Sequence, residues 1–142
     1  MKYLNPQLPK EKWEKACITY DKVFNRIKKH FPNEFSEKFL KWDFHDACVM
    51  RMDFHIAEND EIDLDMHLHN FWNGDVDHYI KFKNITNVKM NVELFPEWLY
   101  AEIFPIKNQK DVKGKRFSLE ILFPDYENLY VEFGSIEYSQ KK

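Results

Sequence analysis

Apolar and polar residues alternate along residues 45–69, with a polar break near Asn59. This period of two is typical of a β-hairpin with one buried and one solvent-exposed face. The apolar positions are Cys48, Met50, Met52, Phe54 and Ile56 in the first arm, and Ile62, Leu64, Met66 and Leu68 in the second. A turn centred on Asn59 places three polar pairs opposite each other: His55 with Asp63, Asp53 with Asp65, and Arg51 with His67.

Two amphipathic helices are predicted before this hairpin. Over residues 9–31, apolar residues recur at spacings of three and four, which aligns them in one stripe, and Pro32 ends the helix. A shorter helix is expected over residues 33–42, with Asn33 as its N-cap. The two stripes consist of Trp13, Ala16, Cys17, Tyr20, Phe24, Ile27 and Phe31, followed by Phe35, Phe39 and Trp42.

Further strands are expected after the hairpin, so that the sheet spans residues 47–138. They cover residues 78–83, 88–92, 97–105, 117–123 and 129–138, with a bulge at Gly134 in the last one. Residues 97–105 are apolar on both faces, which is typical of a strand that is covered on both sides.

The order of these elements predicts an α+β fold in one domain of residues 1–142. Two N-terminal helices would pack on a mostly antiparallel meander of six or seven strands. A partly closed barrel is the alternative, because a long meander of large side chains tends to curl. The core should be rich in rings, since the chain contains 13 Phe, 7 Tyr and 4 Trp.

Composition narrows the classes of partner. A formal net charge of −3 gives no reason to expect binding to nucleic acid or to an anionic membrane. No apolar run approaches the roughly 20 residues that span a bilayer, and residues 1–10 lack the apolar stretch of a signal peptide. Cys17 and Cys48 fall on apolar faces without C-x-x-C spacing. We therefore expect a cytoplasmic protein with reduced cysteines.

The polar face of the hairpin is the main concentration of chemically versatile groups. Histidine and aspartate are ligands of zinc, manganese and iron, and histidine also serves as a general acid or base. The alternative is a purely structural one: a solvated face whose charges pair across the hairpin. The spacing of the candidate ligands matches no metal signature, so we favour the structural interpretation and expect no cofactor. The metal-ligand candidates are Asp53, His55, Asp63, Asp65 and His67.

Glu102 is a carboxylate within the apolar segment 97–105, on the same face as Tyr100. If buried, it needs a partner or a raised pKa, and both conditions are typical of functional carboxylates. Together with Trp98 and Tyr100 it would form a small-molecule pocket under a curved sheet. The alternative places Glu102 at a sheet edge or in a hydrogen bond with a tyrosine hydroxyl.

Two loops offer weaker signals. Phe71 and Trp72 precede Asn73-Gly74, the strongest turn signal in the chain, and would form an aromatic binding tip if exposed. Burial of both rings against the sheet is the favoured interpretation. The second loop is basic and is interpreted as solvated, with contact to an acidic partner as the alternative. It contains Lys107, Lys110, Lys113, Lys115 and Arg116, interrupted by Asp111.

Four segments together carry a family resemblance: FHDACV at 44–49, NDEIDLDM at 59–66, IKFKNI at 80–85 and WLYAEI at 98–103. With an N-terminal helix before them, the chain resembles an uncharacterised family of small Gram-positive bacterial proteins, a domain of unknown function. The resemblance implies a bacterial cytoplasmic protein and transfers no activity or catalytic residue. Similar layouts of helices followed by a sheet occur among toxin-immunity proteins.

Three functions remain open from the sequence. The favoured one is a non-enzymatic binding or interaction protein, of an immunity-like kind, that uses an exposed sheet face or the Phe71–Trp72 loop to bind a protein partner. The second is a metal-binding protein or metal-dependent enzyme built on the hairpin face. The third is a small-molecule binder with its pocket near Glu102. No catalytic residue is assigned, because the chain contains no G-x-S-x-G, P-loop, G-x-G-x-x-G or H-E-x-x-H motif.

Overall fold

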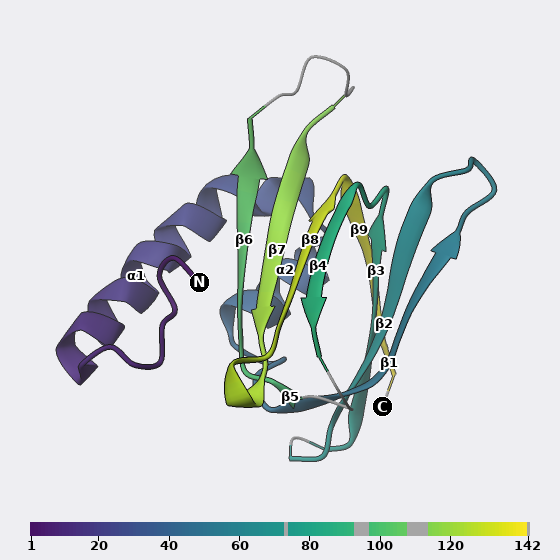
Figure 1. The fold of residues 1–142 in the computed structure, drawn as a ribbon. Helices are drawn as coiled ribbons and strands as arrows, with labels where there is room; N and C mark the ends of the chain where they lie inside the picture. The colour runs from purple at the N-terminus through teal and green to yellow at the C-terminus, as the bar shows by residue number, and fades with distance from the viewer. Residues whose placement is uncertain (73, 93–96, 108–113, 142) are drawn as a thin grey trace.

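The computed structural model describes residues 1–72, 74–92, 97–107 and 114–141. It shows an α+β fold in which two helices precede the strands along the chain (Figure 1). The helices are α1 Lys10–Ile27 and α2 Asn33–Leu40, with 3₁₀ turns η1 Lys28–His30 and η2 Pro124–Tyr126. The strands are β1 Ala47–Ile56, β2 Ile62–Asn70, β3 Val76–Lys83, β4 Asn87–Asn91, β5 Glu97–Trp98, β6 Tyr100–Ile106, β7 Arg116–Leu122, β8 Asn128–Phe133 and β9 Ser135–Lys141.

The helices form where the apolar stripes predict them, but their ends differ. Asn33 is the first helical residue of α2, not its N-cap, because Pro32 occupies the capping position in an extended conformation. The helix ends at Leu40 in a Schellman-type turn, in which the Asp43 N–H donates to the Lys38 carbonyl. Trp42 takes the left-handed position of this turn with φ of 61°, so it lies beyond the helix that was expected to contain it.

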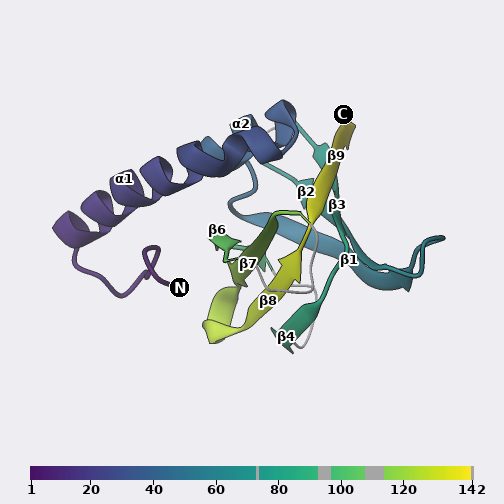
Figure 2. The same cartoon turned by 90° about the horizontal axis from the view of Figure 1, so that it is seen from above.

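The strands form two antiparallel sheets rather than one meander of six or seven strands. Their orders are β5-β1-β2-β3-β9 and β4-β8-β7-β6, and together they form a curled half-barrel (Figures 1 and 2). The expected strand 97–105 is divided: Trp98 pairs with Ala47 in the first sheet, whereas the Leu99 N–H donates to Leu122 in the second. Gly134 likewise marks the passage from β8 to β9 and not a bulge within one strand.

The register of the opening hairpin is confirmed. All three predicted polar pairs face each other across β1 and β2. A bulge at Met50 interrupts this pairing, since Val49 faces Leu68 and Arg51 faces His67. The bulge reverses the faces, so Val49 is buried while Met50 is 45% exposed. The assignment of Cys48 and Met50 to the buried face was therefore wrong.

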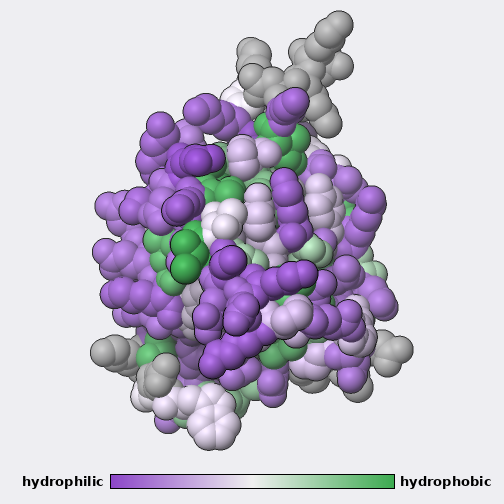
Figure 3. All heavy atoms as spheres, turned by 90° about the vertical axis from the view of Figure 1, so that its left-hand side faces the viewer, coloured by the Kyte–Doolittle hydropathy of each residue, from purple (hydrophilic) through white to green (hydrophobic). Residues whose placement is uncertain are grey.

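One aromatic-rich core joins both helices to both sheets. The helices lie together on one side of the sheets (Figure 2). The rings of Phe24 in α1 and Phe39 in α2 pack with centroids 4.5 Å apart. The side of the molecule toward α1 is mainly hydrophilic, with hydrophobic atoms in small separate areas (Figure 3). In the part of the chain that the structure describes, neither helix has the length and apolar character needed to cross a membrane.

Candidate functional site

The face of the five-stranded sheet that points away from the core, here called the outer face, carries three of the six histidines: His55, His67 and His69. Strand pairing fixes its side chains in rows, because alternate residues of neighbouring strands project to the same side. The rows are Arg51–His67–Tyr79–Ser139, Asp53–Asp65–Lys81–Glu137 and His69–Asp77–Lys141.

A groove with a volume of about 420 Å³ runs across the first two of these rows. Tyr79 lies in it, 40% exposed, with its ring stacked on His67 at a centroid distance of 4.6 Å. The charged groups around the groove pair with one another: His55 contacts Asp65 at 3.2 Å, and Lys81 lies 3.9 Å from the same carboxylate. The groove is therefore polar, internally charge-balanced and organised around an accessible aromatic ring.

The most tightly bonded cluster on the outer face is His67, His69 and Asp77. The His67 Nε2 and His69 Nδ1 atoms each lie 2.7 Å from Oδ1 of Asp77. The two histidines are on the same face because they are two residues apart on β2, and His69 faces Asp77 on β3. The hydrogen bond that His69 donates to Asp77 raises the pKa of His69, while the bonds that Asp77 accepts from His67 and His69 lower the pKa of Asp77.

The five predicted metal ligands do not converge. Asp53 pairs with Arg51, and His55 contacts Asp65 rather than the Asp63 opposite it. Asp63 is only 2% exposed, because the segment after β3 folds over it and the Asn84 N–H donates to its carboxylate. Its predicted place on the solvent-exposed face was wrong. Within the described residues, no group of three or more His, Cys, Asp or Glu is arranged to hold a metal ion.

The Phe71–Trp72 loop is exposed, so the interpretation that both rings are buried was wrong. Trp72 is 83% exposed and Phe71 is 58% exposed. The edge of the Phe71 ring packs on His69 with centroids 4.3 Å apart, which joins the loop to the outer face. Asn70 anchors the loop from the buried side, because its side chain donates to the Asp43 carbonyl. Asn73 of the predicted turn is outside the described residues.

Glu102 has a structural partner. It is buried on β6, an edge strand of the four-stranded sheet, so its predicted place at an edge is confirmed. Its carboxylate accepts hydrogen bonds from the backbone N–H groups of Lys2, Tyr3 and Leu4 at 2.7, 2.7 and 3.0 Å. The alternative of a tyrosine hydroxyl as its partner was wrong.

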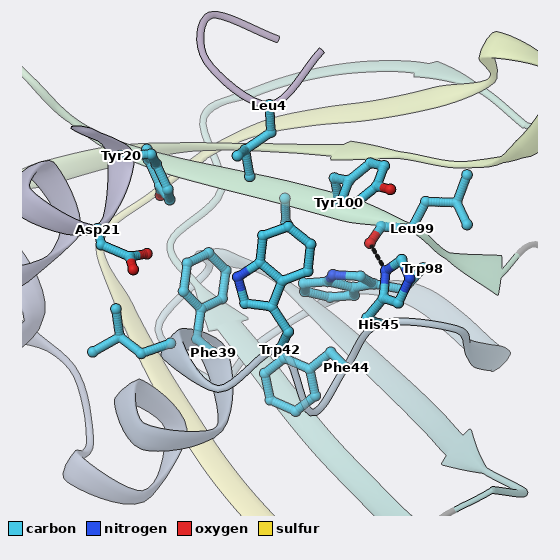
Figure 4. Close-up of a pocket in the computed structure, with 12 residues that line it drawn as sticks. Leu4, Tyr20, Asp21, Phe39, Trp42, Phe44, His45, Trp98, Leu99 and Tyr100 are labelled. Carbon is cyan, nitrogen blue, oxygen red and sulfur yellow. Dashed lines mark hydrogen bonds between the residues drawn. The ribbon is translucent and has the colours of Figure 1, made fainter. Parts of the chain in front are cut away.

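The predicted pocket near Glu102 is a small cavity that this side chain does not line. Trp98 and Tyr100 line it together with Trp42, and the His45 ring there bonds the Leu99 carbonyl (Figure 4). Its volume is about 30 Å³, close to the share of one water molecule in the liquid. Small-molecule pockets are typically about ten times larger.

The basic segment divides into two parts. Lys107 and Lys115 are exposed, as the interpretation of a solvated loop requires, whereas Lys110 and Lys113 are outside the described residues. Arg116 is 7% exposed and donates to the Asn84 carbonyl and the Thr86 hydroxyl, both at 2.7 Å. It therefore stabilises the passage between the two sheets and does not belong to a solvated loop.

Comparisons with protein-family models, with curated proteins and with solved structures each gave no match. The resemblance to an uncharacterised bacterial family therefore stays a prediction.

Two residues of the most tightly bonded cluster, His69 and Asp77, were missed as candidates. The spacing of His67 and His69 by two residues was a usable signal for one half of the cluster, but the contribution of Asp77 depends on the pairing of β2 with β3.

Replacing Asp77 with asparagine is expected to lower the pKa of His69 towards its ordinary value. A histidine with a raised pKa stabilises the fold below about pH 6.5, and an aspartate with a lowered pKa stabilises it above about pH 4. The loss should be about 1 kcal/mol between these pH values and smaller at pH 8. Urea unfolding between pH 4 and pH 8 measures the loss of stability, and NMR titration of the imidazoles measures the pKa of His69. The control is Asp53→Asn. An equal loss of stability in that control, or an unchanged pKa of His69 in Asp77→Asn, contradicts the prediction.

Proposed function

We propose that this protein is a non-enzymatic binding protein that contacts a protein partner through the outer face and the Phe71–Trp72 loop. The observation that carries the proposal is the 83% exposure of Trp72 at the end of an ordered sheet face. The apolar surface of so exposed a tryptophan is removed from water only when a partner covers it, and that removal is favourable. Tryptophan, tyrosine and arginine dominate the binding energy of protein interfaces, and Trp72, Tyr79 and Arg51 all lie on this surface.

The dimensions of the surface support a macromolecular partner. Four neighbouring strands of seven to ten residues cover at least about 20 by 25 Å at ordinary strand spacing. The exposed loop adds to this area, and a standard interface buries about 800 Å² on each partner. An immunity-like role, with a toxin as the partner, is the form of this proposal that the similar layouts of toxin-immunity proteins suggest.

A small polar ligand is the second candidate, because the groove of about 420 Å³ falls within the range of small-molecule sites. Such a ligand would contact Tyr79 and the charged groups around it without requiring Trp72. The two candidates therefore differ in whether the Phe71–Trp72 loop takes part. The metal-dependent alternative has less support, since its five candidate ligands do not converge: Asp53, Asp63 and His67 bond groups outside the set, and His55 and Asp65 bond each other.

Photo-crosslinking tests the proposal. With a benzophenone amino acid at position 72, we expect a discrete adduct of protein size in a lysate of the source organism. The control carries the same residue at position 126, where Tyr126 is 71% exposed between β7 and β8. Excess unlabelled wild-type protein should suppress the adduct at least tenfold better than a Phe71→Ala/Trp72→Ala variant.

Two outcomes contradict a protein partner on this surface. One is the same adducts from positions 72 and 126, which indicates non-specific capture. The other is equal competition by the wild type and the double variant, which shows that the loop contributes nothing to binding. The variant should keep wild-type stability within about 0.5 kcal/mol, because both rings are exposed.

A further inference from the structure

A second groove, on a different part of the molecule, is lined by basic residues. It lies where the end of α1 and the η1 turn meet the end of β6 and the start of β7, and its volume is about 320 Å³. Its ionisable lining residues are Arg26, Lys29, His30, Lys115 and Arg116. The rest of its lining is apolar and includes the buried side chains of Ile27 and Phe117. No carboxylate is among the described residues that line it.

The positive charges of this basic groove are not balanced as those of the outer face are. On the outer face, Arg51, Lys81 and Lys83 each pair with a carboxylate. Over the described ranges, no carboxylate lies within 4 Å of the charged groups of Arg26, Lys29 or Lys115. The basic groove therefore differs from the outer face in lacking carboxylates beside these cations, and not merely in the number of its cations.

Two of the basic groups contact each other. The Lys115 ammonium donates a hydrogen bond to Nε2 of the neutral His30 ring, at 3.4 Å. Burial, Lys115 and Lys29 together lower the pKa of His30, which means that its protonated form is disfavoured where it stands. An anion bound beside these groups would offset the charges of Lys115 and Lys29 and so stabilise the imidazolium of His30.

Arg116 adds a buried cation to the edge of the groove. Its guanidinium donates to neutral oxygens, those of Asn84 and Thr86, and no ion pair with a carboxylate is seen in the part of the chain that the structure describes. A buried charge without a counter-charge is costly, and a nearby anion reduces that cost.

A purely structural role explains only part of this cluster. Cations at the end of α1 complement the helix dipole, which accounts for Arg26 and Lys29. Lys115 lies just before β7 and Arg116 is the first residue of that strand, so the helix dipole does not explain why they face the same groove. The convergence of two distant segments of like charge on one hollow points to a ligand of opposite charge.

We propose that the basic groove binds a small, multiply charged phosphate compound. Lysine and arginine are the side chains that bind phosphate oxygens, and several of them around one hollow favour more than one negative charge. The volume is sufficient for a di- or triphosphate group, and the apolar lining offers a surface for an attached organic part. This site is separate from the outer face and does not depend on the function proposed for that surface.

Isothermal titration calorimetry tests this proposal with tripolyphosphate and with ATP, at constant ionic strength and with chloride as the competing anion. We expect one site per chain and at least a tenfold loss of affinity in Lys115→Glu. The matched control is Lys12→Glu, because Lys12 is exposed on α1 and the change in net charge is identical. Arg26→Glu is a second test variant on an exposed position. The test variant Lys115→Glu and its control Lys12→Glu should both unfold at the wild-type temperature.

NMR titration gives an independent readout, since bound phosphate should raise the pKa of His30 towards or above its ordinary value. Equal affinities for the two probes assign the site to the phosphate chain, and tighter ATP binding assigns it to a nucleotide-type compound. The proposal is overturned if neither probe binds, if Lys12→Glu weakens binding as much as Lys115→Glu, or if the His30 pKa does not move.

Discussion

Replacing Glu102 with alanine is expected to lower the free energy of unfolding by about 3 kcal/mol and to release residues 2–4 from the sheet. The carboxylate is 1% exposed and accepts three backbone N–H bonds from these residues. Hydrogen bonds to a charged acceptor contribute about 1.5–3 kcal/mol each, but released N–H groups regain water, which reduces the net loss. Leu4 is also buried, so its apolar contacts would loosen with the segment.

Urea unfolding measures the loss of stability, and hydrogen exchange measures the release of the segment. Exchange of the amides of residues 3 and 4 should become at least tenfold faster in Glu102→Ala. Glu102→Gln should have an intermediate effect, because the amide keeps one acceptor oxygen without the charge. Glu137→Ala is the control, since that side chain is exposed on β9 and should change stability by less than about 0.5 kcal/mol. A loss no larger than that of the control contradicts the role assigned to Glu102.

Glu102 illustrates why the surroundings of a residue can be inferred from the sequence more easily than its partner, although the sequence left its burial open. The apolar residues around it on β6 are local in sequence and indicate a buried position. Its partners are about 100 residues away, and residues 2–4 carry no pattern that indicates where they bind. The same limit applies to the cluster of His67, His69 and Asp77, which exists only because β2 pairs with β3 in one register.

Local patterns were sufficient where a single hairpin decides the geometry. The register of β1 with β2 followed from alternation and a polar turn near Asn59, and the three polar pairs are confirmed. Local patterns were insufficient at Leu99 and Gly134, where the chain passes from one sheet to the other. Apolar residues continue through both positions, because the two sheets share one core and bury the same kind of face. One long strand and two strands in different sheets therefore have the same sequence pattern.

The second large effect expected is an acid sensitivity that depends on His78. This side chain is 1% exposed, and its Nε2 accepts a hydrogen bond from the Asn70 side chain at 3.0 Å. The proton is therefore on Nδ1, which lies 2.8 Å from the Tyr138 hydroxyl and donates to it. The network connects β2, β3 and β9 around a neutral imidazole. Burial, followed by the nearby positive charge of Lys38, lowers the pKa of His78 to about 4.

A histidine with a pKa of about 4 in the folded state and about 6.5 in the unfolded state makes stability fall as the pH falls, because only the unfolded chain takes up the proton. The expected loss from this residue is about 2 kcal/mol between pH 7 and pH 5 and about 3 kcal/mol by pH 4. The raised pKa of His69 acts in the opposite direction over the same range, so the two contributions must be separated by mutation.

His78→Gln keeps one donor and one acceptor in the network without a group that titrates in this range. At pH 7 the variant should be less stable than the wild type by about 1–2 kcal/mol, because the amide fills the site less well. Its stability should fall by about 2 kcal/mol less than that of the wild type between pH 7 and pH 5, as measured by urea unfolding. Equal slopes in the two proteins would show that His78 takes up its proton in the folded state, and therefore that the buried network does not keep the imidazole neutral.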